Sequence, residues 1–323
     1  MDQNTTTAVA HSNIAVAKYW GKRDTSLNLP LFDSVSFNVE DLTSKTTAVW
    51  MDGRKTDDLI IDGWHVPEHR MGRCRRILDK IRLDKGWDKH CILTSHNNFV
   101  HSSGLASSAS GYAAIALAAS VGAGLNYTAE ELSALARLGS GSASRSIPSG
   151  WCRWYAGHQE EGSDSFATQI APPNHWDLRV FVVQASNKTK HVSSTEAMEI
   201  SRTSPYWDSY CNDAQKAADI AQSAIIYRDF ESLTAIMHHS FMMLHALMLS
   251  CGICYFAPKS IELLQYILRS CHALPVCCTL DAGANVVVLC EPIAWPFVKN
   301  QILSLNVPFV ETTIGHGTEI IQE

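Results

Sequence analysis

The sequence has no strong excess of charge of either sign. Its 323 residues include 26 Lys and Arg against 32 Asp and Glu, which gives a formal net charge of −6 at pH 7. A chain with this balance has no general affinity for nucleic acid or for an anionic membrane surface. We therefore expect no nucleic-acid partner, and any anion-binding site must be a local cluster of basic residues.

The sequence also lacks an apolar run of the roughly 18 residues or more that a membrane span needs. The segment Met1–Thr7 contains no basic stretch followed by an apolar run, so it does not have the pattern of a signal peptide. Together these absences predict a cytoplasmic protein with no membrane partner.

The 10 cysteines lack the setting of a disulfide framework, because no export signal is predicted, and we expect reduced thiols. Cys251 and Cys254 have the C-x₂-C spacing of a zinc site, and His238, His239 and His245 lie just upstream. A second pair of ligands at zinc spacing is missing. We therefore favour structural roles for these side chains and predict no metal site built from them.

The length of the chain predicts two domains, because a typical domain has about 100–150 residues. Strand-like and helix-like segments are mixed without a regular βαβ repeat, which is typical of the α+β class. The clearest break is Pro172-Pro173. We therefore expect an N-terminal domain over residues 1–174 and a C-terminal domain over residues 175–323.

A run of glycine and small hydroxyl residues, Gly104–Ser110, leads into an alanine-rich segment that ends at Ser120. This pattern predicts a loop followed by a buried helix, with Ser107 and Ser108 near its first turn. The first N–H groups of a helix attract phosphate. The segment is not a P-loop, because no lysine follows its second glycine. A small-residue helix packed in a core explains the same pattern equally well.

A second run of this kind, Gly139–Ser146, follows a helix whose start is indicated by a capping box of Thr128 and Glu131. Arg145 in this run can hold a carboxylate or a phosphate at two points. The basic cluster Lys18–Arg23 also suits a polyanion, although a solvated basic turn is the commoner case.

Asp281 directly follows a predicted strand and begins the sequence Asp-Ala-Gly. Taken alone, the sequence Asp-Ala-Gly is more typical of a simple turn, because Asp and Gly are common turn residues.

Five segments occur in one order along the chain: Lys18–Lys22, Gly104–Ser110, Gly139–Arg145, Val192–Met198 and Thr279–Gly283. Together they resemble the diphosphomevalonate decarboxylases, a family of the galactokinase, homoserine kinase, mevalonate kinase and phosphomevalonate kinase (GHMP kinase) superfamily. The resemblance covers about residues 8–320. It implies an α+β, two-domain GHMP kinase fold, with an N-terminal ribosomal protein S5 domain 2-like domain and a C-terminal ferredoxin-like α/β domain.

The resemblance implies an ATP-dependent reaction in the mevalonate route of isoprenoid biosynthesis. The family phosphorylates the 3-hydroxyl of (R)-5-diphosphomevalonate and then releases CO₂ and phosphate to give isopentenyl diphosphate and ADP. It implies that Asp281 orients or deprotonates the 3-hydroxyl, that Arg145 holds the substrate carboxylate, and that Lys18 adds charge near the reacting phosphate.

Further site residues are implied by the same resemblance. Those on the substrate side are Tyr19, Trp20, Gly21, Lys22, Arg70, Ser140, Gly141, Ser142, Ala143, Ser144, Arg145 and Thr195. Those on the nucleotide side are Asn97, Ser107, Ser108, Ser194 and Met198. Mg²⁺ is expected to accompany ATP without a dedicated protein cage, and a homodimer is expected.

The sequence departs from the family pattern at Val100–Ser103, Ile147–Gly150 and Ala284. These departures leave the reacting residues in place but leave the phosphorylation state of the substrate open. One alternative is therefore a kinase of this fold that acts on mevalonate or phosphomevalonate, or an enzyme that decarboxylates the monophosphate. The other is a non-catalytic, ligand-binding relative.

Overall fold

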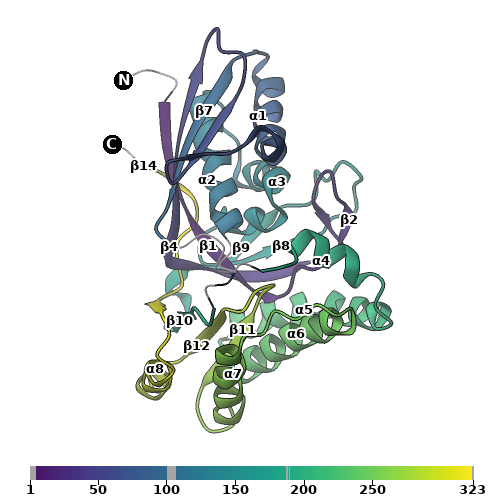
Figure 1. Ribbon diagram of the computed structural model, residues 1–323, viewed down its shortest axis with the longest axis vertical. Coiled ribbons are helices and arrows are strands. Elements are labelled where there is room, and N and C mark those ends of the chain that lie inside the picture. The colour runs from purple at the N-terminus through teal and green to yellow at the C-terminus, as the bar shows by residue number, and fades with distance from the viewer. Residues whose placement is uncertain (1–4, 100–106, 187, 189, 322–323) are drawn as a thin grey trace.

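The computed structural model describes residues 5–99, 107–186, 188 and 190–321. The chain forms two β-sheets with helices packed on them, one sheet in the upper half of Figure 1 and one in the lower half. The two halves share a hydrophobic core in which Val16 and Phe37 of the first sheet meet Val180 and Leu289 of the second.

The first sheet has eight strands, and most neighbouring strands run antiparallel. Its strands are β1 (Thr5–Ala17), β4 (Ser34–Met51), β5 (Asp58–Ile61), β6 (Trp64–His65), β7 (His90–Asn97), β8 (Trp151–Trp154), β9 (Ala167–Ala171) and β14 (Glu319–Ile321). The C-terminal strand β14 returns to pair with β1, so both ends of the described chain lie at one edge of this sheet.

Three helices cover one face of the first sheet: α1 (Gly72–Lys85), α2 (Ser107–Gly122) and α3 (Ala129–Gly139). The alanines of α2 are buried against this sheet, because small side chains let the helix approach it closely. The sequence of this segment is explained either by a phosphate-binding loop with a helix or by a helix packed in the core. The structure shows that the helix is packed in the core. The residues of the predicted phosphate loop that precede it, Gly104–Ala106, lie outside the described residues.

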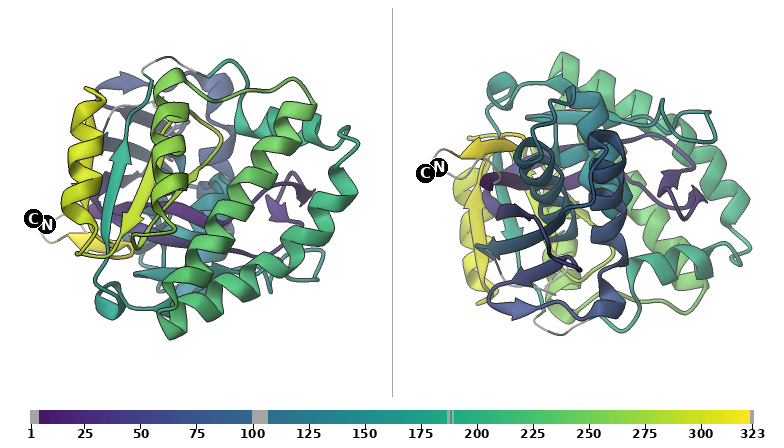
Figure 2. Two further views of the ribbon diagram at one scale, coloured as in Figure 1. Left: turned by 90° about the horizontal axis from the view of Figure 1, so that it is seen from below. Right: turned by 90° about the horizontal axis from the view of Figure 1, so that it is seen from above.

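The second sheet has four antiparallel strands: β10 (Arg179–Val183), β11 (Val276–Leu280), β12 (Val286–Cys290) and β13 (Phe309–Thr312). The core on one face includes α5 (Trp207–Tyr227) and α6 (Phe230–Ser250), which run side by side (Figure 2). The core on the other face includes α7 (Pro258–Ser270) and α8 (Trp295–Ser304). Short segments complete the fold: β2 (Lys22–Asp24) paired with β3 (Leu29–Pro30), α4 (Ser194–Ser201), and the 3₁₀ helices η1 (Glu68–Arg70), η2 (Gly141–Ser146) and η3 (Pro173–His175).

This mixed architecture agrees with the predicted α+β class. Pro172 and Pro173 lie between β9 and β10, where the chain passes from the first sheet to the second. The division at residue 174 stays a prediction, because β14 joins the first sheet and one core cluster draws on both halves.

Helix α6 is long and apolar enough to span a membrane by length and composition alone, and half of its apolar window is buried inside the protein.

The histidines of α6 have partners within the protein. His238 accepts a hydrogen bond from the backbone N–H of Cys278 at 3.1 Å, and His239 pairs with Asp213 of α5. His245 stacks on Phe256. Among the described residues, no three His, Cys, Asp or Glu side chains gather as a metal site. These contacts support the structural interpretation of the histidines.

The predicted capping box at the start of α3 is confirmed. The backbone N–H of Glu131 donates to Thr128 Oγ1 at 3.2 Å, and that of Thr128 donates to Glu131 Oε2 at 2.8 Å.

We expect Thr128→Ala to lower the free energy of unfolding by about 1 kcal/mol, because one N-terminal donor of α3 loses its acceptor. Urea denaturation measures this change. Thr128→Ser keeps the hydroxyl and is the control, and equal stability of the two variants would contradict the assigned cap.

Candidate active site

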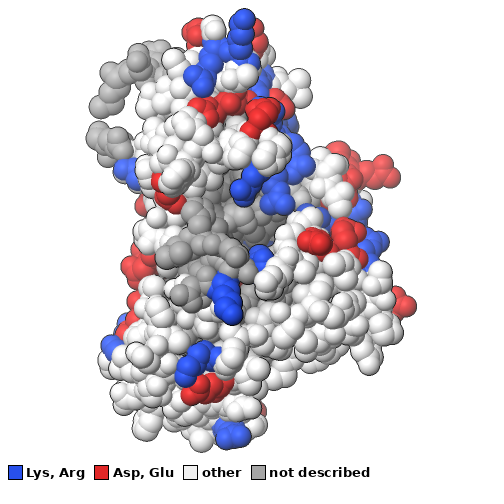
Figure 3. Space-filling model, viewed as in Figure 1, with Lys and Arg blue, Asp and Glu red and all other residues white. Residues whose placement is uncertain are grey.

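A cleft of about 370 Å³ lies where the two sheets meet. It is lined from the first sheet and its helices by the end of β1, the end of α3 and η2, and from the other half by α4 and the residues after β11. Lys and Arg side chains gather along one rim of the hollow in this part of the surface (Figure 3). Because the protein has a net negative charge, it can bind an anion only at a local cluster of basic residues such as this one.

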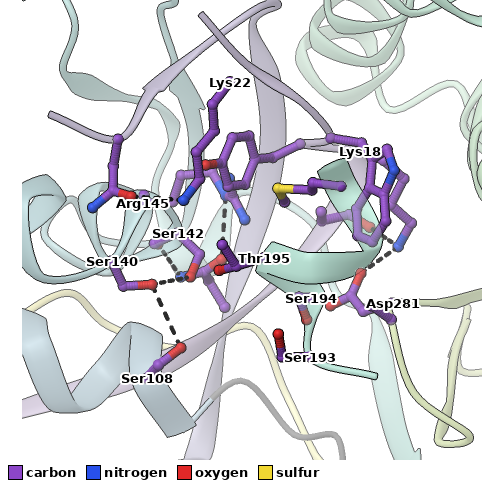
Figure 4. Close-up of a pocket in the computed structure, with 18 of the residues that line it drawn as sticks. Lys18, Lys22, Ser108, Ser140, Ser142, Arg145, Ser193, Ser194, Thr195 and Asp281 are labelled. Carbon is purple, nitrogen blue, oxygen red and sulfur yellow. Dashed lines mark hydrogen bonds and ion pairs between the residues drawn. The ribbon is translucent and has the colours of Figure 1, made fainter. Parts of the chain in front are cut away.

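The ion pair of Lys18 and Asp281 joins the two halves across this cleft (Figure 4). Lys18 follows the last residue of β1 and Asp281 follows the last residue of β11. Lys18 Nζ donates to Asp281 Oδ1 at 2.6 Å and to the carbonyl oxygen of Ala15 at 2.8 Å. Lys18 is only 4% exposed, and burial lowers the pKa of its ammonium while Asp281 opposes that shift.

Arg145 of η2 is buried beside this pair. Its Nε donates to Asn13 Oδ1 at 3.2 Å and its Nη1 to Ser34 Oγ at 3.0 Å, and its guanidinium lies about 6 Å from the rings of Tyr19 and Trp154. Burial lowers the pKa of the guanidinium. Among the described residues, no carboxylate lies within ion-pair distance of Arg145. Its charge is therefore available to a bound anion.

A second cationic group lies near the start of the β2–β3 hairpin. Lys22 Nζ donates to Asn28 Oδ1 at 2.7 Å, and Arg73 of α1 lines the cleft nearby. Burial is the main cause that lowers the pKa of Lys22 to about 8, and the charges of Arg73 and Arg76 add to the shift. This side of the cleft therefore holds several positive charges that a polyanion would stabilise.

Three serine hydroxyls, those of Ser108, Ser140 and Ser142, lie in a row beside these cations and form a hydroxyl track (Figure 4). Ser140 Oγ lies 3.2 Å from Ser142 Oγ and 3.5 Å from Ser108 Oγ at the start of α2. The hydroxyl of Tyr19 is buried with no hydrogen-bond partner among the described residues, and burial raises its pKa. It faces Gly141, where an added Cβ would lie 2.7 Å from the Tyr19 oxygen. Only glycine lets this loop approach the ring so closely.

The opposite wall comes from α4 and the loop before it. Ser193 caps α4, Lys190 Nζ donates to Ser194 Oγ at 2.9 Å, and Arg73 donates to Thr195 Oγ1 at 3.3 Å. The last contact links α1 of the first half to α4 of the second, across the cleft. These hydroxyls therefore complete the polar part of the lining, in which the charged side chains other than Asp281 are cationic among the described residues.

The structure brings most of the predicted site residues to this one cleft. Those that line it are Lys18, Tyr19, Trp20, Lys22, Ser108, Ser140, Gly141, Ser142, Arg145, Ser194, Thr195, Met198 and Asp281. The strand ends that carry Lys18 and Asp281 are far apart in sequence, and only the contact between the two halves brings them together.

Other predicted residues do not line the cleft. Ala143 and Ser144 are fully buried because η2 turns them toward the core, where the Ser144 hydroxyl donates to the carbonyl oxygen of Ser133. Gly21 adopts a φ of 92° and shapes the chain between Trp20 and Lys22 without lining the cleft. Asn97, at the end of β7, accepts a hydrogen bond from Ser44.

Arg70 also lies outside the lining, in the short helix η1 before α1. Arg73, three positions later and in the first turn of α1, lines the cleft instead. Ser107 begins α2, and its side chain lies outside the described residues.

Several lining residues escaped the sequence analysis: Asn13, Asn28, Arg73, Lys190 and Ser193. Arg73 belongs to a helix with several arginines, and their spacing gives no sign of which one faces a cleft. Asn13 directly precedes the apolar end of β1, and its sequence gives no sign that its side chain faces a cleft.

Comparison with known proteins shows what this arrangement is similar to. Residues 10–167 match the family model of the diphosphomevalonate decarboxylase-like N-terminal domain, and residues 180–313 match that of the mevalonate 5-diphosphate decarboxylase C-terminal domain. The chain is 35% identical to diphosphomevalonate decarboxylase of Schizosaccharomyces pombe, over 96% of this chain and 83% of that protein.

Two solved structures show the same similarity in three dimensions. Mevalonate diphosphate decarboxylase from Staphylococcus aureus matches with a TM-score of 0.91 and 29% identity, over 99% of this chain and 98% of that one. MDDEF in complex with MVAPP, AMPPCP and magnesium matches with a TM-score of 0.89 and 31% identity, over 99% of both chains.

The lowered pKa of Lys22 implies that the free energy of unfolding depends on pH. Its folded value of about 8 lies below the usual 10.5, so between these values the unfolded chain binds the extra proton and the stability of the folded state rises with pH. We expect the wild type to gain about 2 kcal/mol in free energy of unfolding relative to Lys22→Met between pH 7 and pH 10.

Urea denaturation of both proteins at the two pH values measures this gain. Lys80→Met is the control, because Lys80 lies on the exposed face of α1 in an ion pair with Asp84. A stability difference between the wild type and Lys22→Met that does not change with pH would contradict the assignment of Lys22 as a buried, charged group.

Proposed function

The chain belongs to the diphosphomevalonate decarboxylase family, and from this membership we propose which residues perform each part of the reaction in the cleft. The reaction is the ATP-dependent decarboxylation of (R)-5-diphosphomevalonate to isopentenyl diphosphate, with ADP, phosphate and CO₂ as the other products. The observation that carries the residue assignment is one cleft in which Arg145 and Lys22 have no carboxylate partner and Asp281 is the only acidic side chain, among the described residues.

Asp281 acts on the 3-hydroxyl of the substrate. Lys18 holds its Oδ1, and among the described residues Oδ2 accepts no hydrogen bond. This second oxygen is free to accept the hydroxyl proton, so that the alkoxide can attack the γ-phosphate of ATP. Lys18 fixes the direction of the carboxylate and supplies a positive charge beside the reacting oxygen.

Arg145 binds the substrate carboxylate. When the 3-phosphate leaves, the electrons of the bond between C1 and C2 form the double bond between C2 and C3, and CO₂ is released. The carboxylate must be held in line with the departing phosphate for this to happen. Arg145 suits that role because Asn13 and Ser34 already fix its guanidinium.

The diphosphate of the substrate lies against the second cationic position, formed by Lys22 and Arg73, with the hydroxyls of Tyr19, Ser140 and Ser142. The unpartnered buried hydroxyl of Tyr19 supports this placement, since a buried donor without a partner costs about 1–3 kcal/mol that an incoming oxygen recovers.

ATP binds on the side of Ser108 and the α4 wall. A related structure holds AMPPCP and magnesium together with MVAPP, and this supports ATP and Mg²⁺ for the present chain. Among the described residues there is no cluster of three carboxylates or imidazoles, which fits a Mg²⁺ held mainly by nucleotide phosphates, with the Ser108 hydroxyl to assist. The bound ion would neutralise charge on the transferred phosphate.

Three further features stay predictions: the division into a ribosomal protein S5 domain 2-like and a ferredoxin-like domain near residue 174, a cytoplasmic location and a homodimer. Comparison of each half with single domains of known type tests the first, imaging of the protein in cells tests the second, and its mass in solution by light scattering tests the third.

A substrate panel tests the proposed function. Mevalonate, its monophosphate and its diphosphate are each incubated with ATP and Mg²⁺, and ADP and CO₂ are both measured. We expect equal amounts of ADP and CO₂ with the diphosphate only. ADP without CO₂ from mevalonate or its monophosphate would indicate a kinase, CO₂ from the monophosphate would indicate another substrate, and binding without either product would indicate a non-catalytic relative.

Asp281→Asn is expected to lower kcat by about 10³-fold or more, because the amide cannot accept the hydroxyl proton. Affinity for ATP should change by less than about threefold, since Asp281 is assigned to the substrate hydroxyl. Steady-state kinetics and nucleotide titration measure the two effects. Asp177→Asn, at an exposed position, is the control. Near-normal turnover of Asp281→Asn would show that another group takes the proton.

A further inference from the structure

The ammonium of Lys22 is held by a neutral oxygen. Its Nζ donates to Asn28 Oδ1 at 2.7 Å, and both side chains are buried and line the cleft. Among the described residues, no carboxylate lies within ion-pair distance of Lys22. The amide therefore fixes where the ammonium sits without neutralising its charge.

Asn28 is itself anchored at its other end. Its Nδ2 donates to the carbonyl oxygens of Arg137 at 2.9 Å and Leu138 at 3.3 Å, in the last turn of α3. These carbonyls have no partner within the helix and carry partial negative charge. The amide thus uses its donor for the helix end and its acceptor for Lys22, so one side chain connects the hairpin to α3.

This connection sets the geometry of the anion site. Two residues after Leu138 the chain reaches Ser140, the first member of the hydroxyl track. Asn28 therefore fixes the ammonium of Lys22 relative to the hydroxyls of Ser140 and Ser142. The hairpin alone does not do this, because β2 and β3 are only three and two residues long.

The backbone of Asn28 offers a simpler explanation that has to be separated from this one. Its φ is 54°, in the left-handed region, where asparagine is common as a turn residue. If the turn were its only role, glycine would serve there, since glycine adopts this conformation without steric cost. The hydrogen bonds at both ends of the side chain are not needed for a turn.

We propose that Asn28 is a positioning residue for the substrate diphosphate: it orients the ammonium of Lys22 through a neutral acceptor and leaves the full positive charge for the ligand. The proposal rests on the assignment of Lys22 to the diphosphate in the proposed function. An aspartate at this position would form an ion pair with Lys22 and compete with the ligand. It would also face the carbonyls of Arg137 and Leu138 without a proton to donate.

The test compares Asn28→Gly and Asn28→Asp with the wild type. For Asn28→Gly, which keeps the turn and removes the amide, we expect KM for 5-diphosphomevalonate to rise roughly tenfold, with kcat and KM for ATP within about twofold. For Asn28→Asp we expect a larger rise, roughly a hundredfold, because the new charge opposes the ligand directly. Ser26→Ala, at an exposed site in the same hairpin, should match the wild type.

Calorimetric titration with inorganic diphosphate separates this proposal from the proposed function. The dissociation constant for diphosphate should rise by similar factors in the two Asn28 variants. An unchanged KM and diphosphate affinity in Asn28→Gly would overturn the proposal and leave Asn28 as a turn residue. Wild-type affinity in Asn28→Asp would overturn it as well. Diphosphate binding that weakens as expected, in a protein that does not turn over 5-diphosphomevalonate, would instead refute the proposed function alone.

Discussion

The ion pair between Lys18 and Asp281 is the contact on which the site depends. It connects the end of a strand in one sheet to the end of a strand in the other, at 2.6 Å. A buried ammonium without a partner costs several kcal/mol, so Lys18 can stay charged only while the two halves keep Asp281 in place. The pair thus ties the relative placement of the two sheets to the group that is proposed to take the substrate proton.

The other cations of the cleft have no such partner. Arg145 and Lys22 are buried against neutral oxygens of Asn13, Ser34 and Asn28, and burial lowers the pKa of both. Their charges lower the stability of the free protein. A ligand with a carboxylate and a diphosphate supplies the missing negative charges, so binding of that ligand should stabilise the folded state. The site is in this sense complementary to a substrate with two separate anionic groups.

Local features of the fold could be predicted from the sequence because they depend on neighbouring residues. The capping box of Thr128 and the buried alanine helix α2 are of this kind. The return of β14 to β1 could not be predicted, because the pairing joins segments about 300 residues apart and only the closed core specifies it. The order of the five motifs predicts that Lys18, Arg145 and Asp281 belong to one site, and the structure brings them to one cleft. This order could not place Arg73 or Asn28, whose roles depend on which face of a helix or turn meets the cleft.

In the proposed complex, one cleft holds the 3-hydroxyl at Asp281, the carboxylate at Arg145 and the diphosphate at Lys22. A crystal structure with 5-diphosphomevalonate and a non-hydrolysable ATP analogue tests this arrangement most directly. We predict that the 3-hydroxyl oxygen lies within about 2.6–3.2 Å of the Asp281 carboxylate, with the substrate carboxylate on the Arg145 guanidinium. A substrate bound in the reverse direction, with its diphosphate on Arg145 and its hydroxyl away from Asp281, would contradict it.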